Sequence, residues 1–220
     1  MSGTDWVSLL GIATSIIIAI AQHWQTNRLK FFEYRMQVVN MLHSIYRAVE
    51  ANLELVSQRA SDDRPFGSSF LVVLMNNSVM QDCQRSIGEP EFQNKFLLKQ
   101  NEMERIANGS RFLFDERDAR YCIEFVDSYF RCLMEEYKMQ CLLGSINKTN
   151  EGSNLRAMIK CQRYADVERI QIGSDQAIKN QSKEIQKACR TLLSSYKQFE
   201  EKDVIKNMER KLRVRLKKTI

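Results

Sequence analysis

Residues that can carry chemistry are present in this chain, but their spacing forms no familiar catalytic site. The two histidines, His23 and His43, lie outside any Cys–His, Ser–His–Asp or HExxH arrangement. No GxxxxGK[ST] or GxGxxG segment is present to hold a phosphate or a dinucleotide. The paired acids Glu135–Glu136 and Glu200–Glu201 are adjacent in sequence, so each pair points to different sides of a helix. We therefore expect no catalytic residue, no cofactor and a protein that is not an enzyme.

The cysteines are also too dispersed for a metal site. No two of them form a CxxC pair and none lies near a histidine, whereas a zinc site needs clustered ligands. They fall at apolar positions of predicted helices, which favours buried thiols in a reducing compartment over disulfides. The six are Cys83, Cys122, Cys132, Cys141, Cys161 and Cys189.

Composition indicates one helical domain with a basic end. The 220 residues include only eight Gly and two Pro, too few for a β-protein with many turns. Lys and Arg exceed Asp and Glu by six, 33 against 27, and the stretch from Lys206 onward holds seven cations against one acid. The remainder of the chain is therefore neutral, which disfavours a general nucleic-acid-binding surface. The basic tail consists of Arg210, Lys211, Arg213, Arg215, Lys217 and Lys218.

The N-terminal segment has the features of a membrane span. No residue between Asp5 and Arg28 carries a permanent charge, and Trp6 and Trp24 are separated by about 27 Å of helix. This length fits a hydrocarbon core about 30 Å thick, with one tryptophan at each interface. A signal peptide is the main alternative, but it requires a basic segment that is absent here. A buried core helix is a further alternative.

Flanking charges predict the orientation of this span. Asp5 precedes it, while Arg28, Lys30 and Arg35 follow it. The positive-inside rule then places the N-terminus outside and the remainder in the cytoplasm. We expect a single-pass protein of the inner membrane, with residues 1–26 as the anchor and residues 27–220 as a cytoplasmic helical bundle.

Small and polar residues share one face of the predicted span. At 100° per residue these positions lie within roughly 80° of one another, and a small-xxx-small pattern lets spanning helices pack closely. We expect self-association, with a polar lumen if several copies surround an axis; a monomeric anchor is the alternative. This stripe consists of Ser8, Gly11, Ser15, Ala19 and Gln22.

Apolar residues at helical spacing predict the remaining elements. One long helix, or two nearly collinear ones, should run from the span to about Ala60. Further helices should end near Ala107, begin near Asp115, and occupy Leu155–Ile170, after a polar loop over Asn147–Asn154. A last pattern runs from Ile178 almost to the C-terminus. We expect an all-α bundle of five or six cytoplasmic helices.

This architecture, a single span continuing into a small helical domain with a basic end, resembles the membrane accessory proteins of type VI-B CRISPR–Cas loci. The resemblance implies a domain related to the HEPN bundle and a ring-shaped pore that depolarises the inner membrane in antiviral defence. HEPN ribonucleases carry an Arg four to six residues before a His. Here Arg35 and His43 are separated by seven residues, so no catalytic residue transfers.

The leading hypothesis is a homo-oligomeric membrane effector that forms or gates a pore. Its expected partners are copies of itself, membrane lipid, and a CRISPR effector or another defence protein. A membrane-tethered adaptor that binds a protein or RNA is the alternative, and a divergent HEPN-type ribonuclease is the third. The basic tail is interpreted as a solvated helix end or as a contact to anionic lipid or a neighbouring subunit, with RNA less favoured.

Overall fold

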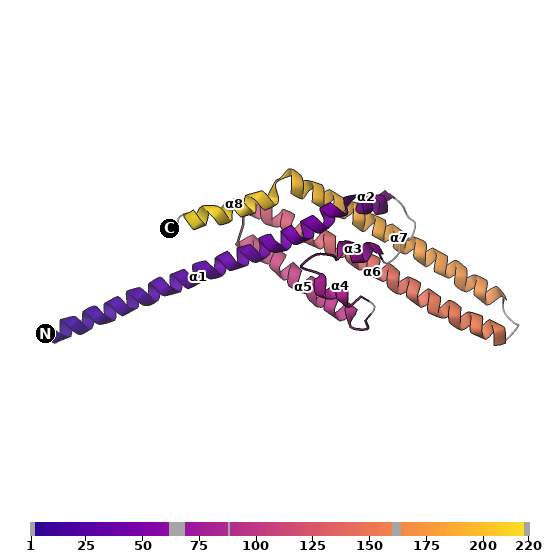
Figure 1. The fold of residues 1–220 in the computed structure, drawn as a ribbon, viewed down its shortest axis with the longest axis horizontal. Helices are drawn as coiled ribbons and strands as arrows, with labels where there is room; N and C mark the ends of the chain where they lie inside the picture. The colour runs from indigo at the N-terminus through magenta and orange to yellow at the C-terminus, as the bar shows by residue number, and fades with distance from the viewer. Residues whose placement is uncertain (1–2, 62–68, 88, 160–163, 218–220) are drawn as a thin grey trace.

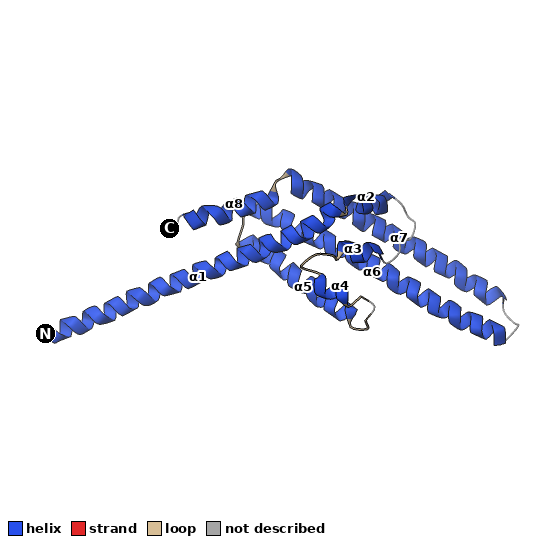
Figure 2. Cartoon of the chain, viewed as in Figure 1, coloured by secondary structure: helices blue, strands red, loops and turns tan. Residues whose placement is uncertain are grey.

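The computed structural model describes residues 3–61, 69–87, 89–159 and 164–217, with side chains for residues 14–61, 70–87, 89–145 and 175–212. Within these residues the chain forms eight α-helices and one short 3-10 helix, with no strand (Figure 2). The predicted all-α class is confirmed. The helices are α1 (Gly3–Ala51), α2 (Leu53–Ser61), α3 (Ser69–Leu74), α4 (Gln81–Arg85), α5 (Phe92–Gly109), η1 (Ser110–Phe112), α6 (Glu116–Ile159), α7 (Tyr164–Glu201) and α8 (Val204–Lys217).

The N-terminal helix α1 is 49 residues long, and only its second half belongs to the body of the molecule (Figure 1). Between the Gly at its first position and Ala51 it contains one internal glycine, Gly11, and no proline, so nothing in the sequence breaks it. A single residue, Asn52, separates it from α2, and the Asn52 side chain donates a hydrogen bond to Ala48 O. The expected helical stretch to about Ala60 is confirmed as two helices, of which the second ends at Ser61.

A long hairpin of α6 and α7 supports the body. The two helices pack along each other, and α2 and α5 pack against them (Figure 1). Aromatic rings fill the junction: Phe125 of α6 stacks on Phe199 of α7 with ring centroids 4.7 Å apart. Tyr196 of α7 stacks on Tyr46 of α1 at 5.1 Å. These contacts fix the second half of α1 against the hairpin, because aromatic pairs combine a large buried area with a preferred geometry.

The hairpin extends through a region that the sequence analysis assigned to a loop. Residues 147–154 are helical in α6, so the predicted polar loop there is wrong. The predicted Leu155–Ile170 helix is also wrong, because α6 ends at Ile159 and α7 begins at Tyr164. Polar residues and one glycine each cost a helix only about 1 kcal/mol or less. Without a proline, this cost does not end a helix that is already well formed.

The remaining elements place α8 beside α1. The predicted helix ending near Ala107 is confirmed as α5. The predicted number of cytoplasmic helices, five or six, is too low, because seven α-helices follow α1 in the described chain. One of the additional helix boundaries lies at Asp203, whose φ of 48° turns the chain between α7 and α8. Asp tolerates this left-handed conformation better than most residues. The turn directs α8 back along α1, toward the end of the body from which α1 projects (Figure 1).

The cysteines are free thiols at all five described positions. Four are buried as expected, but Cys141 is exposed, so the prediction is wrong there; Cys161 lies outside the described residues. Cys132 of α6 and Cys189 of α7 lie 3.3 Å apart, sulfur to sulfur. This contact and burial raise the pKa of Cys132 well above its usual value. Cys132 therefore packs in the hairpin as a small uncharged group.

Candidate functional site

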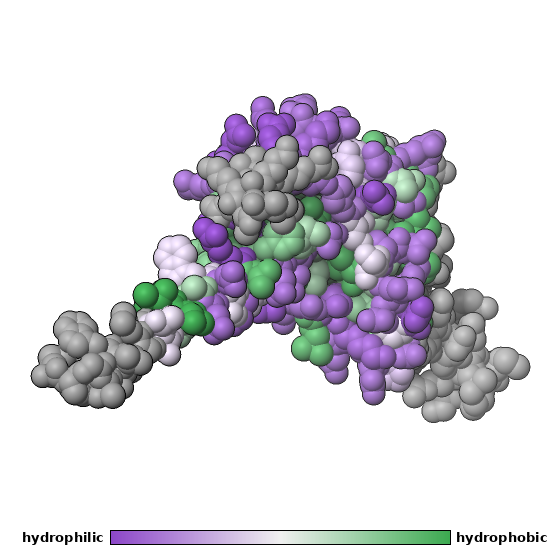
Figure 3. Space-filling model, turned by 60° about the vertical axis from the view of Figure 1, so that its left-hand side comes forward, coloured by the Kyte–Doolittle hydropathy of each residue, from purple (hydrophilic) through white to green (hydrophobic). Residues whose placement is uncertain are grey.

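The projecting half of α1 is the most unusual surface of the protein. Every residue from 14 to 31 is exposed, and bulky apolar side chains lie on the faces of the helix outside the small-polar stripe. Ile17 is 67% exposed and Trp24 is 64% exposed. Figure 3 shows hydrophobic residues on this helix where it leaves the body. A contiguous apolar surface of this kind usually marks a site that a membrane or another protein covers.

Residues of the small-polar stripe lie on this projecting helix. Ser15, Ala19 and Gln22 are on α1 and exposed. The backbone of Ser8 and Gly11 is helical, but their side chains lie outside the described residues. The same holds for Trp6, which the sequence analysis predicted at one membrane interface, while its predicted counterpart Trp24 is described and exposed.

Within the described residues, no helix contains a segment that is long and apolar enough to cross a membrane.

A second candidate site is a polar groove of about 1000 Å³ between α1, the α3–α4 connection and α8. His43 of α1 donates a hydrogen bond from Nε2 to Glu209 Oε1 of α8, at 2.7 Å. Arg47 lies one turn further along α1 and also lines the groove. The residue pair His43 and Glu209 is separated by 166 positions, so no local motif announces it. The groove can accept a polar ligand or a polar surface of a partner.

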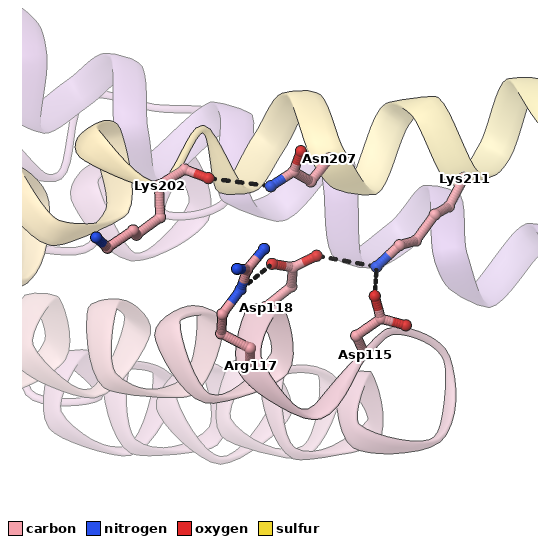
Figure 4. A network of polar contacts seen from close by, with 6 residues as sticks. All are labelled: Asp115, Arg117, Asp118, Lys202, Asn207 and Lys211. Atoms are coloured by element: carbon pink, nitrogen blue, oxygen red, sulfur yellow. Dashed lines mark hydrogen bonds and ion pairs between the residues drawn. The ribbon is translucent and has the colours of Figure 1, made fainter.

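The third candidate site is a smaller hollow, of about 590 Å³, where α1, the start of α6 and α8 meet. Lys211 of α8 donates a hydrogen bond to Asp118 Oδ2 at 2.9 Å and another to Asp115 Oδ2 (Figure 4). Arg117 lies 3.6 Å from the other oxygen of Asp118. Asp118 is only 2% exposed, so this carboxylate sits at the base of the network. The contacts join the C-terminal helix to the start of α6.

Electrostatics of this network favour its charged form. The hydrogen bond from Lys211 lowers the pKa of Asp115. Burial disfavours the charged form of Lys211, but the hydrogen bonds that it donates to Asp115 and Asp118 outweigh this effect and raise its pKa. Asp115 and Lys211 are therefore ionised near neutral pH, which strengthens the hydrogen bond between them.

Only part of the basic tail lies within the described side chains. Arg210 is exposed on α8, whereas Lys211 is half-buried in the network above. Arg213, Arg215 and Lys217 continue α8, with side chains outside the described set, and Lys218 lies outside the described residues. The six cations are thus not equivalent: Lys211 is a structural contact between helices.

The sequence analysis did not single out several residues of the polar groove and of the smaller hollow. Phe112 follows the end of α5 and is 86% exposed. In the sequence, the start of α6 has the charged residues that are common at helix starts: Asp115, Arg117 and Asp118. Lys211 contacts the two acids only because α8 packs beside this part of α6. No group of three or more metal-ligating side chains occurs in the described part of the chain.

Comparison with protein-family models, with curated proteins and with solved structures finds no match to this chain. Function is therefore argued from the geometry of these sites alone.

Proposed function

We propose that this protein is a single-pass inner-membrane effector that assembles with copies of itself and forms or gates a pore. One observation carries the proposal: α1 continues without a break from the predicted span into the body, and residues 14–31 expose bulky apolar side chains on the faces outside the small-polar stripe. An exposed apolar surface of this extent requires a non-aqueous or protein environment. A bilayer supplies this environment for residues 6–24, since the segment has the required length.

The continuous helix also suggests how assembly would affect the membrane. Ser15, Ala19 and Gln22 lie on one side of a helix that is rigidly joined to the body. If several copies pack through this side, the polar members face the central axis and the apolar ones face lipid. A rearrangement of the bodies would reach the spans directly, because no flexible linker intervenes in α1. Membrane depolarisation in antiviral defence is the role that the resemblance to type VI-B accessory proteins suggests.

Two measurements on the full chain test this function. Alkaline carbonate should leave the protein in the membrane pellet, whereas a peripherally bound protein would be released. After extraction in mild detergent, light scattering with size-exclusion chromatography should give a mass of several protomers. Release by carbonate would contradict the anchor, and a single monomeric species would contradict the assembly.

The membrane-tethered adaptor is the second candidate, and the polar groove favours it. The groove joins α1 to α8 through His43 and Glu209 and presents Arg47 at its edge. A monomer that stays in the membrane and retains a protein partner only when Arg47 is intact would support the adaptor. A ring that permeabilises vesicles would support the pore.

A further inference from the structure

Cationic and aromatic side chains gather in the hollow beside Lys211. Four cations line it, Arg35, Arg117, Arg210 and Lys211, against two acids. Both acids, Asp115 and Asp118, contact Lys211, which leaves the hollow with a net positive charge from its arginines. Guanidinium groups present paired N–H donors that match the oxygen atoms of a phosphate.

The aromatic residues of the hollow have two different environments. Phe114 is buried, and the Arg35 guanidinium lies over its ring, 5.7 Å from the centroid. Phe112 also lines the hollow, but it is 86% exposed, more than any other large apolar residue of the described chain. A phenylalanine held in water beside a cationic hollow fits a ligand that carries a phosphate and an apolar portion together.

The position of the hollow along α1 places it near the membrane surface. The proposed span ends at Trp24, and Arg35 lies eleven residues beyond it, about 16 Å along the helix. The headgroup layer of one leaflet is roughly 5–8 Å thick. The C-terminal end of α8 lies at the end of the body from which α1 projects (Figure 1). The hollow therefore lies at the membrane-facing end of the body, a short distance beyond the headgroup layer.

We propose that this hollow binds the phosphate headgroup of an anionic phospholipid. The inference rests on the proposed function, because the anchor in α1 is what holds the hollow at the membrane surface. Arg117 and Arg210 contact the phosphate, and Phe112 contacts the apolar portion of the lipid. RNA offers the same phosphate chemistry, but a tethered hollow meets lipid at a far higher effective concentration.

Native mass spectrometry of the detergent-extracted full chain tests the site. The protein is titrated with phosphatidylglycerol, with phosphatidylcholine and with inorganic phosphate, and the fraction carrying one bound lipid is measured. We expect phosphatidylglycerol to bind at least tenfold more tightly than phosphatidylcholine. Millimolar phosphate should compete only weakly, because it lacks the apolar portion that Phe112 contacts.

Matched variants assign the binding to the hollow. Arg210→Gln and the double variant Arg117→Gln/Arg210→Gln should each weaken phosphatidylglycerol binding, the double variant by tenfold or more. The control Lys197→Gln/Lys202→Gln removes two exposed charges from the end of α7 and should bind like the unmodified chain. Circular dichroism of each variant checks that the helices are retained, and Arg210→Gln alone suffices if the double variant fails to fold.

Three results would overturn the site: equal binding of both lipids, equal losses in the hollow and control variants, or displacement by phosphate at the concentration that saturates it. Tighter binding of a single-stranded RNA than of phosphatidylglycerol would also overturn it. The result is independent of the anchor, since lipid binding in detergent does not require a span. A failure in carbonate extraction and a failure in lipid binding are therefore distinguishable results.

Discussion

Lys211 of α8 donates a hydrogen bond to the buried carboxylate of Asp118 on α6, at 2.9 Å, across 93 residues of sequence. The same ammonium group also contacts Asp115, at the solvent-exposed start of α6. Lys211, one of the six cations of the basic tail, therefore joins α8 to the start of α6. Its neighbour Arg210 is exposed, so adjacent residues of like charge have different roles.

Lys211→Gln should lower the free energy of unfolding by about 1–3 kcal/mol, because it leaves the buried Asp118 carboxylate without its ammonium partner. Arg210→Gln should change that free energy by about 0.5 kcal/mol or less, as is usual for an exposed site. Urea denaturation of the detergent-extracted chain, followed by circular dichroism, measures both. Equal effects of the two substitutions would show that the contact of α8 with α6 does not depend on Lys211.

Acid should release α8 from α6. Because Lys211 lowers the pKa of Asp115, the folded pKa lies below the unfolded one. The stabilisation is complete above the unfolded value, near 4, and disappears as the pH falls through the folded value. Hydrogen exchange of α8 amides, corrected for the intrinsic rate, should therefore be faster at pH 3 than at pH 6. Asp115→Asn should reduce this difference, and an unchanged difference would contradict the assignment.

Breaking a buried ion pair inside the body should lower the free energy of unfolding more than Lys211→Gln does. Arg59 of α2 donates a hydrogen bond from Nε to Glu136 Oε1 of α6 at 2.6 Å, and both side chains are 2% exposed or less. Arg59→Leu should cost about 3–5 kcal/mol, since the carboxylate loses its compensating charge. Glu136→Gln keeps a hydrogen-bond acceptor and should cost less.

The pH dependence of the Arg59→Leu deficit provides a further check. Burial already raises the pKa of Glu136, and removal of the cation raises it more. A carboxyl with a raised pKa stabilises the folded state at low pH and loses that contribution as the pH rises. The deficit of Arg59→Leu should thus be smaller at pH 4.5 than at pH 7.5 in urea denaturation, and a larger deficit at the lower pH would contradict this account.

Local periodicity predicted the elements whose apolar faces are buried. Leu42, Ile45 and Val49 repeat at three and four residues on α1, and all three are fully buried. Phe125, Tyr129 and Leu133 repeat every four residues on α6 and are also buried. Such faces can be identified from the sequence because burial selects residue types directly.

Elements and contacts that depend on distant residues were not predicted. The helical state of residues 147–154 follows from continuation of the α6 backbone, not from an apolar pattern. Asp203 carries no signal for a turn comparable to glycine, yet its backbone directs α8 beside α1. The pairs His43–Glu209 and Asp118–Lys211 exist only because of that turn. Neither spacing nor composition relates residues so far apart.

The orientation of the chain can be tested with a reporter that is active only outside the inner membrane. Fused after Ile220, it should remain silent, because Arg28, Lys30 and Arg35 follow the proposed span and hold it with the body inside. A reporter active only in the cytoplasm should give signal from the same position. Strong activity of the first reporter would reverse the proposed topology, and the hollow would then face the other leaflet.

Larger side chains in the small-polar stripe of α1 should impair assembly more than substitutions on the other faces of the same helix. Gly11→Leu/Ser15→Leu adds large side chains where the spans are proposed to approach, so it should lower the assembled mass and the leakage of dye from vesicles by tenfold or more. Ile17→Leu retains an apolar residue of equal size on a different face, and Ile17→Ala removes bulk there; both should assemble and permeabilise like the unmodified chain. Carbonate extraction should be unchanged in all three, because none reduces the apolar length of the span. If the Gly11→Leu/Ser15→Leu chain assembles fully while Ile17→Ala does not, the packing face lies on the opposite side of α1.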